Sequence, residues 1–287
     1  MLTDPDFISQ LEMLSLLTKR VLGGSLKADR ASDKKGSGIK FADYSEYKFG
    51  DDYRSIDWKV YGRLETLIIK MFEIEEDVSI NIFLDTSPSM MAKLDYAKKI
   101  SAALGYIALK NMDRLAIFGV NDQLEVIQQP CHGKVNIFPM LRALEALEPG
   151  GEDTNLFDCL QEFYHRKPRK GVSVFISDFF IKSGYQKALD QLKWFKHDVY
   201  CIQIQDSKEI SCDWKGDVTL QCIESNATKK ITISPIEAKK YQKAVEKWNA
   251  DFLTYCAKHE IGCCYTLTDQ PFESVIQLIL RQGGLVS

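Results

Sequence analysis

Residues 78–84 read Val78-Ser79-Ile80-Asn81-Ile82-Phe83-Leu84, and the chain continues as Asp85-Thr86-Ser87-Pro88-Ser89. The first seven residues are mostly β-branched or apolar, which predicts a buried strand of a parallel sheet. Asp85, Ser87 and Ser89 then follow at alternate positions, where the strand ends. Ligands of open α/β sheets bind at that edge, and hard divalent cations take oxygen ligands. This stretch therefore predicts both an α/β fold and a candidate metal site.

Two later segments supply further oxygen atoms. The polar loop at residues 150–154 ends in Thr154, just before an apolar helix candidate. Residues 172–178 form a second apolar strand candidate that ends in Asp178. In a parallel sheet both segments can lie at the same edge as the first strand. The predicted ligand set is Asp85, Ser87, Ser89, Thr154 and Asp178.

These five residues resemble the metal-ion-dependent adhesion site of von Willebrand factor A domains. In that family the two serines and the threonine reach the ion directly or through water, and the two aspartates mostly act through water. The resemblance implies Mg²⁺, with Mn²⁺ or Ca²⁺ as alternatives, and a protein partner whose Asp or Glu fills the last position. The chain departs from the family at Glu152-Asp153, which stand where the family usually has Gly. These carboxylates are expected to add ligands or to shift the loop that carries Thr154.

Strands and helices alternate along the rest of the chain, which predicts right-handed crossovers and a mostly parallel sheet. The short connection Asn121-Asp122 predicts a hairpin and hence one antiparallel edge strand. The strand candidates are 78–84, 114–120, 123–129, 172–177, 198–204 and 263–267. The helix candidates are 94–110, 136–147, 156–166, 185–196, 236–258 and 272–281. We predict a von Willebrand factor A-like (Rossmann-like) α/β domain at residues 77–287 with helices on both faces of the sheet and a β-hairpin insertion at about 207–234.

Residues 1–76 are expected to form a separate N-terminal segment. Asp4-Pro5 predicts the start of a helix, and Gly23-Gly24 predicts its end. Residues 19–40 are rich in Lys and Arg and favour a solvated linker, with docking onto an acidic surface as the alternative. Residues 64–75 predict an extended strand that leads into the α/β domain.

Residues 41–58 combine aromatic and charged side chains and read FADYSEYKFGDDYRSIDW. Residues 50–52 predict a turn, Ile56 and Trp58 are expected to be buried, and Arg54 is expected to bridge carboxylates. This stretch resembles the bacterial and archaeal family called domain of unknown function 58. The matching positions are Phe41, Tyr44, Glu46, Tyr47, Gly50, Asp51, Asp52, Arg54, Ile56, Asp57 and Trp58.

The family match has one mild departure, because Gly62-Arg63 stands where the family has Ala-Arg. Two roles are open for this signature: holding the N-terminal segment on the α/β domain, or binding a partner directly. The residues expected to serve either role are Tyr47, Gly50, Asp51, Asp52, Arg54, Asp57 and Trp58.

The resemblance implies a non-enzymatic function. Members of the family look like adaptors of MoxR-type AAA+ ATPases that act in chaperone-like assembly or remodelling of complexes. One alternative is a Mg²⁺-dependent phosphohydrolase that uses the same sheet edge, and another is a purely structural A domain that binds no metal. The sequence contains neither a G-x-S-x-G elbow nor a G-x-x-x-x-G-K-[ST] phosphate loop.

Composition narrows the possible partners and the compartment. The net charge of −3 argues against a nucleic-acid partner. The eight cysteines include no C-x-x-C pair, which favours reduced thiols in a cytoplasmic protein. No apolar run is long enough to predict a transmembrane helix. The acidic N-terminus lacks the basic region of a signal peptide, so a cytoplasmic location is expected.

Overall fold

The computed structural model describes residues 1–16, 40–73, 77–151, 154–211, 216–221 and 228–281. The chain divides into two compact units. We call Met1–Lys19 together with Val78–Ser287 the α/β unit, and Arg20–Asp77 the signature unit. Most of the basic segment at 19–40 lies outside the described residues, as do Glu152-Asp153.

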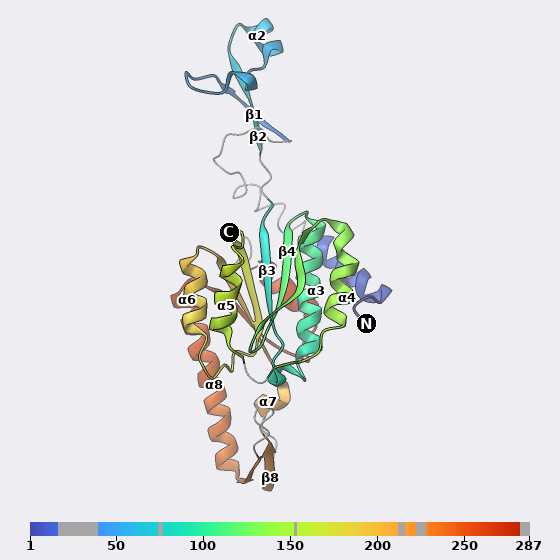
Figure 1. The fold of residues 1–287 in the computed structure, drawn as a ribbon, viewed down its shortest axis with the longest axis vertical. Coiled ribbons are helices and arrows are strands. Elements are labelled where there is room, and N and C mark those ends of the chain that lie inside the picture. The colour runs from blue at the N-terminus through green and yellow to red at the C-terminus, as the bar shows by residue number, and fades with distance from the viewer. Residues whose placement is uncertain (17–39, 74–76, 152–153, 212–215, 222–227, 282–287) are drawn as a thin grey trace. The chain divides into compact units, whose positions relative to one another are not determined.

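A six-stranded sheet in the order β10-β7-β6-β3-β4-β5 forms the centre of the α/β unit (Figure 1). All neighbouring strands are parallel except β4 and β5, which pair antiparallel around the turn that was predicted at Asn121. The predicted α/β fold, with a mostly parallel sheet and one antiparallel edge strand, is confirmed. The strands are β3 (Ser79–Asp85), β4 (Arg114–Val120), β5 (Leu124–His132), β6 (Gly171–Ser177), β7 (Asp198–Gln205) and β10 (Gly262–Leu267).

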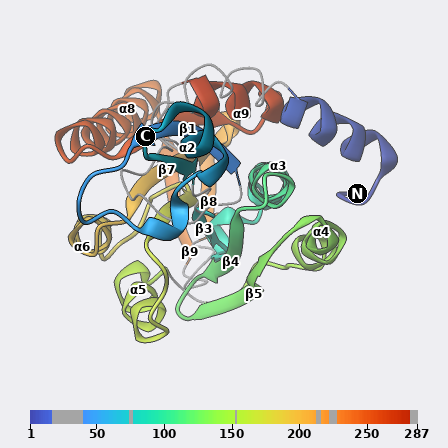
Figure 2. The same ribbon diagram turned by 90° about the horizontal axis from the view of Figure 1, so that it is seen from above.

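Helices cover both faces of the sheet, as Figure 2 shows from above. Because side chains alternate along a strand, Ile82 and Leu84 of β3 join one apolar cluster and Phe83 joins the other. The first cluster includes α3 (Leu94–Lys110), α4 (Ile137–Glu145) and α9 (Phe272–Arg281). The second includes α5 (Leu156–His165), α6 (Gln186–Trp194) and α8 (Pro235–Lys258).

A row of phenylalanine rings crosses the centre of the sheet. Phe83 pairs in register with Phe118 of β4 and Phe175 of β6, and its ring lies 5.4 and 4.6 Å from theirs. Phe163 of α5 packs edge-on against Phe83 at 5.0 Å. Such contacts add to the hydrophobic burial of the rings. The row therefore fixes the alignment of three strands two residues before the candidate site.

The helix at residues 5–16 belongs to the α/β unit. Leu11 and Leu14 are buried in the same cluster as α9, and the rings of Phe7 and Phe272 lie 5.4 Å apart. This division differs from the expected grouping of residues 1–76, because the apolar face of this helix is buried against the α/β core. Among the described residues, no helix combines the length and the apolar character that crossing a membrane requires.

The predicted hairpin insertion is also present. After β7 the chain forms α7 (Ser207–Ser211), β8 (Gly216–Gln221) and β9 (Thr228–Ile233), and the two strands pair antiparallel. Ser234 and Glu237 then form a reciprocal capping box at the start of α8.

The signature unit contains β1 (Lys40–Glu46), the 3₁₀ turn η1 (Tyr53–Ser55), α2 (Trp58–Leu64) and β2 (Ile68–Glu73). β1 and β2 pair antiparallel. The strand predicted within 64–75 is confirmed at β2, whereas β1 and α2 were not predicted. Asp57 caps α2 by accepting hydrogen bonds from Lys59 N and Val60 N, and it forms an ion pair of 3.0 Å with Lys70.

Three expectations for the signature need correction. Trp58 is 62% exposed and Ile56 is only half-buried, so neither is a core residue. The guanidinium of Arg54 lies 5.9 Å from the centre of the Tyr53 ring, and no ion pair from it to a carboxylate is found among the described residues. The physical reason is size, because so short a segment cannot enclose an apolar core of its own. The predicted turn is confirmed by Gly50, which has a φ of +107°.

Candidate metal site

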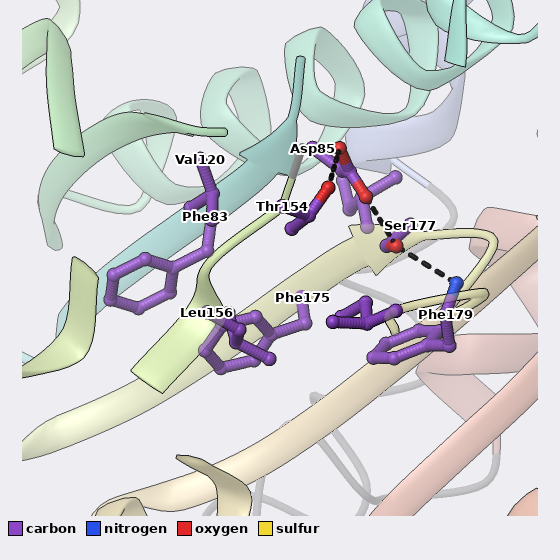
Figure 3. Close-up of a pocket in the computed structure, with 10 residues that line it drawn as sticks. Phe83, Asp85, Val120, Thr154, Leu156, Phe175, Ser177 and Phe179 are labelled. Carbon is purple, nitrogen blue, oxygen red and sulfur yellow. Dashed lines mark hydrogen bonds between the residues drawn. The ribbon is translucent and has the colours of Figure 1, made fainter. Parts of the chain in front are cut away.

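Asp85, the last residue of β3, is the centre of the candidate site and is 3% exposed. Its Oδ1 accepts a hydrogen bond of 3.0 Å from the backbone N–H of Ser87. Its Oδ2 accepts a bond of 2.6 Å from the hydroxyl of Ser177, which itself accepts from the N–H of Phe179 (Figure 3). The carboxylate of Asp85 is therefore held in one orientation by the residues that follow β3 and by the last residue of β6.

Thr154 reaches this carboxylate from the loop before α5. Its hydroxyl donates to Asp85 Oδ1 at 3.5 Å (Figure 3). The loop is docked on the sheet by a backbone hydrogen bond of 2.8 Å from Gly150 N to Thr86 O. Gly151 has a φ of +77°, and a Cβ there would clash with the side chains of Asn121 and Asp122. A glycine is therefore required for this close approach.

Ser87 and Ser89 lie side by side. Ser87 precedes the short 3₁₀ turn η2 (Pro88–Met90), which carries Ser89. The two hydroxyl oxygens are 2.9 Å apart and share a hydrogen bond. The alternate spacing noted in the sequence thus places both hydroxyls together, directly after Asp85.

Asp178 follows β6 and is 2% exposed. Its Oδ1 accepts from the N–H of Phe180 at 2.9 Å. Its Oδ2 accepts from the ammonium of Lys93 at 2.6 Å. Asp178 is also close enough to Asp85 for its charge to act on that residue's ionisation.

Asp85 and Asp178 bring two buried carboxylates close together at the site. Burial raises the pKa of Asp85 to about 6, and the negative charge of Asp178 adds to the increase. Hydrogen bonds from Ser177 and Ser87 oppose this shift but do not cancel it. Two carboxylates in a water-poor environment are stabilised by a nearby cation.

Lys93 is the site residue that the sequence reasoning missed. It lies between η2 and α3, is 1% exposed, and pairs with both Asp178 and Glu209 of α7. Burial alone would lower the pKa of Lys93, but the charges of Asp178 and Glu209 outweigh that effect and raise it. No local pattern distinguishes Lys93 from a solvent-exposed lysine, because its burial depends on α7, more than a hundred residues away in the sequence.

The donor set fits a hard divalent cation. All five predicted residues offer oxygen atoms, the type of ligand that Mg²⁺ prefers. Within the described part of the chain, no group of three His, Cys, Asp or Glu side chains is arranged to hold a metal. A cation at Asp85 would therefore depend on the Ser87, Ser89 and Thr154 hydroxyls. Such a shell leaves positions for water and for one further anionic ligand.

The signature residues have local structural roles within their own unit. Asp52 accepts from Arg54 N at the start of η1, and Asp51 accepts from Lys48 N across the turn. The backbone N–H of Tyr47 donates to Leu67 O. The described side chains thus stabilise turns and caps.

Among solved structures, the chain is similar to BatB from Bacteroides thetaiotaomicron, a conserved hypothetical protein, with a TM-score of 0.44 and 14% identity. That match covers 71% of this chain and 96% of BatB. It is also similar to proximal thread matrix protein 1 of the mussel byssus, which was solved with a zinc-occupied MIDAS motif. That TM-score is 0.43 at 10% identity, and the match covers 71% of this chain and 47% of the byssus protein.

The chain has sequence relatives among mycobacterial proteins. The uncharacterized protein Rv1480 of Mycobacterium tuberculosis H37Rv is 25% identical over 256 residues, which cover 86% of this chain and 80% of the relative. The uncharacterized protein MAV169 of Mycobacterium avium is 28% identical over 103 residues, or 36% of this chain and 60% of the relative. The model of the family described as protein of unknown function DUF58 matches residues 43–251. This match includes residues 43–58 of the signature and the whole candidate site, and the chain belongs to that family.

Proposed function

We propose that the α/β unit is a non-enzymatic, metal-dependent protein-interaction module. Its cation would be Mg²⁺, held at the carboxyl end of the sheet. The residues that would hold it are Ser87, Ser89 and Thr154 by their hydroxyls, and Asp85 and Asp178 mainly through water.

One observation carries this proposal: two buried carboxylates and three hydroxyls from separate segments converge where β3 and β6 end. Asp85 Oδ1 receives the Thr154 hydroxyl, and the pKa of Asp85 is raised by burial and by Asp178. A bound divalent cation would offset the repulsion between the two carboxylates and attract an anionic side chain of a partner. Ser177 and the Ser87 backbone would keep Asp85 oriented toward the cation.

The partner we propose is a AAA+ ATPase of the MoxR type, for which this protein would serve as an adaptor in assembly or remodelling of complexes. Support for this partner comes from the family signature in residues 41–58. We also propose a cytoplasmic location, which the free thiols of the six described cysteines support.

The test is a metal titration followed by affinity capture. Wild type, Asp85→Ala and the control Asp122→Ala are titrated with Mg²⁺ and Mn²⁺ by calorimetry. Asp122 is a matched control because it is an exposed aspartate at the same end of the sheet. We expect binding by wild type and Asp122→Ala and a loss of at least tenfold in Asp85→Ala.

Each tagged variant is then used to capture partners in Mg²⁺ and in EDTA. A AAA+ ATPase retained by wild type and Asp122→Ala only in Mg²⁺ is the expected outcome. Equal recovery in all conditions would contradict metal-dependent recognition. Turnover of p-nitrophenyl phosphate that requires Mg²⁺ and disappears in Asp85→Ala would favour the phosphohydrolase instead.

A further inference from the structure

Lys93 connects the candidate metal site to a different part of the fold. Its ammonium lies 2.6 Å from Asp178 Oδ2 and 2.8 and 3.0 Å from the two carboxylate oxygens of Glu209. The lysine is 1% exposed, whereas the Glu209 side chain is 37% exposed. A buried ammonium is thus shared between an inner carboxylate at the site and an outer carboxylate at the surface.

The backbone keeps Lys93 in this position. Its N–H donates to Met90 O at 2.8 Å, and its carbonyl accepts from Ala97 N at 3.0 Å in the first turn of α3. The side chain therefore begins between η2, which carries Ser89, and the helix that follows. Only the flexible end of the side chain is able to move without breaking these bonds.

Glu209 belongs to α7, which opens the hairpin insertion and lies beyond the carboxyl ends of the strands (Figure 1). Glu209 also accepts a bond of 3.2 Å from the N–H of Asp206. The start of α7 is tied to the segment after β10, because Ser207 Oγ donates to Asp269 at 2.7 Å. Within the described residues, Lys93 is the side chain that ties α7 to the metal site.

We propose that Lys93 and Glu209 form an internal lock, in which Lys93 competes with the divalent cation for Asp178 and thereby couples metal binding to the position of α7. This inference rests on the proposed metal-dependent function and specifies its regulation. The Lys93 ammonium and the divalent cation are both positively charged and are both attracted by the Asp178 carboxylate. Each therefore weakens the binding of the other to Asp178. By linkage, a lock that lowers metal affinity is loosened by metal to the same extent.

The test compares Lys93→Met with Lys98→Met. Lys98, in the first turns of α3, is a matched control because it is also a buried lysine, but it contacts Asp95 and the carbonyl of Glu145 rather than the site. Mg²⁺ and Mn²⁺ affinities are measured by calorimetry. Hydrogen exchange of residues 205–211 is measured with and without Mg²⁺.

We expect Lys93→Met to bind metal about tenfold more tightly than wild type and Lys98→Met, within the usual range of coupling between sites. Mg²⁺ is expected to speed exchange in α7 of wild type and to have no effect there in Lys93→Met. If Lys93→Met does not fold, Glu209→Gln serves as the second variant. Its α7 should exchange fast with or without Mg²⁺.

The outcomes separate the lock from the proposed function. Equal metal affinities in wild type and Lys93→Met would overturn the lock and leave the metal-dependent function standing. If wild type binds Mg²⁺ and the exchange of its α7 does not change, the lock would also be overturned. Absence of metal binding in every variant, Lys93→Met included, would overturn both. Metal binding by Lys93→Met alone would support the lock. It would show that Lys93 must leave Asp178 before the wild-type protein binds the metal.

Discussion

The α/β unit and the signature unit differ sharply in how they use aromatic residues. Phe83 in the α/β unit is 1% exposed and contacts three other phenylalanines, whereas Phe49 in the signature unit is fully exposed. Among the signature-unit residues whose side chains are described, only Ile69 and Asp57 are buried. The signature residues that resemble the family therefore lie in a unit that buries few of its described side chains. A dense motif indicates family membership without indicating where the stability of the molecule resides.

The largest effect that would test this comparison is expected from Phe83→Ala. Loss of a buried ring and the cavity it leaves should lower the free energy of unfolding by about 3–5 kcal/mol. Phe49→Ala removes the same atoms from an exposed position and should change it by less than about 0.5 kcal/mol. Urea unfolding followed by circular dichroism measures both. Similar losses of stability in the two variants would show that Phe49 packs against other residues, which would contradict its exposed position.

An intermediate effect is expected from pH at Asp85. The ordinary pKa of 3.8 rises to about 6 in the folded state, so between these values the folded chain binds more protons than the unfolded chain. Stability should therefore fall as pH rises from about 4 to about 6, by about 3 kcal/mol in all. The measurement is urea unfolding in EDTA across this range.

Asp85→Asn removes the titrating group and serves as the control. Its stability should lack this component of the pH dependence. At neutral pH, saturating Mg²⁺ should raise the stability of the wild-type protein again, because the cation binds only the folded chain. Identical pH profiles for wild type and Asp85→Asn would contradict the assignment to this carboxylate.

The smallest global effect is expected at Asp57, which caps α2 in the signature unit. Asp57→Ala should speed hydrogen exchange in α2 while leaving unfolding of the α/β unit unchanged. Asp57→Asn keeps a capping oxygen but loses the charge that pairs with Lys70. Protected exchange in Asp57→Asn but not in Asp57→Ala would assign the effect to the cap. A lower stability of the α/β unit in either variant would contradict the independence of the two regions.

Much of the α/β unit could be predicted from sequence because its periodicity is regular. The helix predicted at 94–110 has those bounds, and the antiparallel edge strand follows the short connection that was predicted at Asn121-Asp122. Thr154 and Asp85 were expected at one edge, and a hydrogen bond joins them. These predictions depend on local spacing and on the general topology of parallel sheets.

The features that were missed or predicted wrongly depend on tertiary contacts, which the spacing of residues along the sequence does not encode. Lys93 is a site residue only because Glu209 and Asp178 surround it. Trp58 was expected to be buried because its side chain is large and apolar, but the short segment that carries it has no apolar core into which it could pack. A usable signal for α2 was present in Asp57, an N-cap residue type directly before Trp58.

The phenylalanine row has a consequence for how damage to the sheet would appear in a binding experiment. Asp85 and Ser177 each stand two residues beyond a ring of that row, on aligned strands. A slip of one residue would turn these side chains to the opposite face, so alignment is either kept or lost. Variants that weaken the row should therefore lower the number of metal ions bound per chain, while the dissociation constant of the remaining sites stays unchanged. Stoichiometry, rather than affinity, would record the loss.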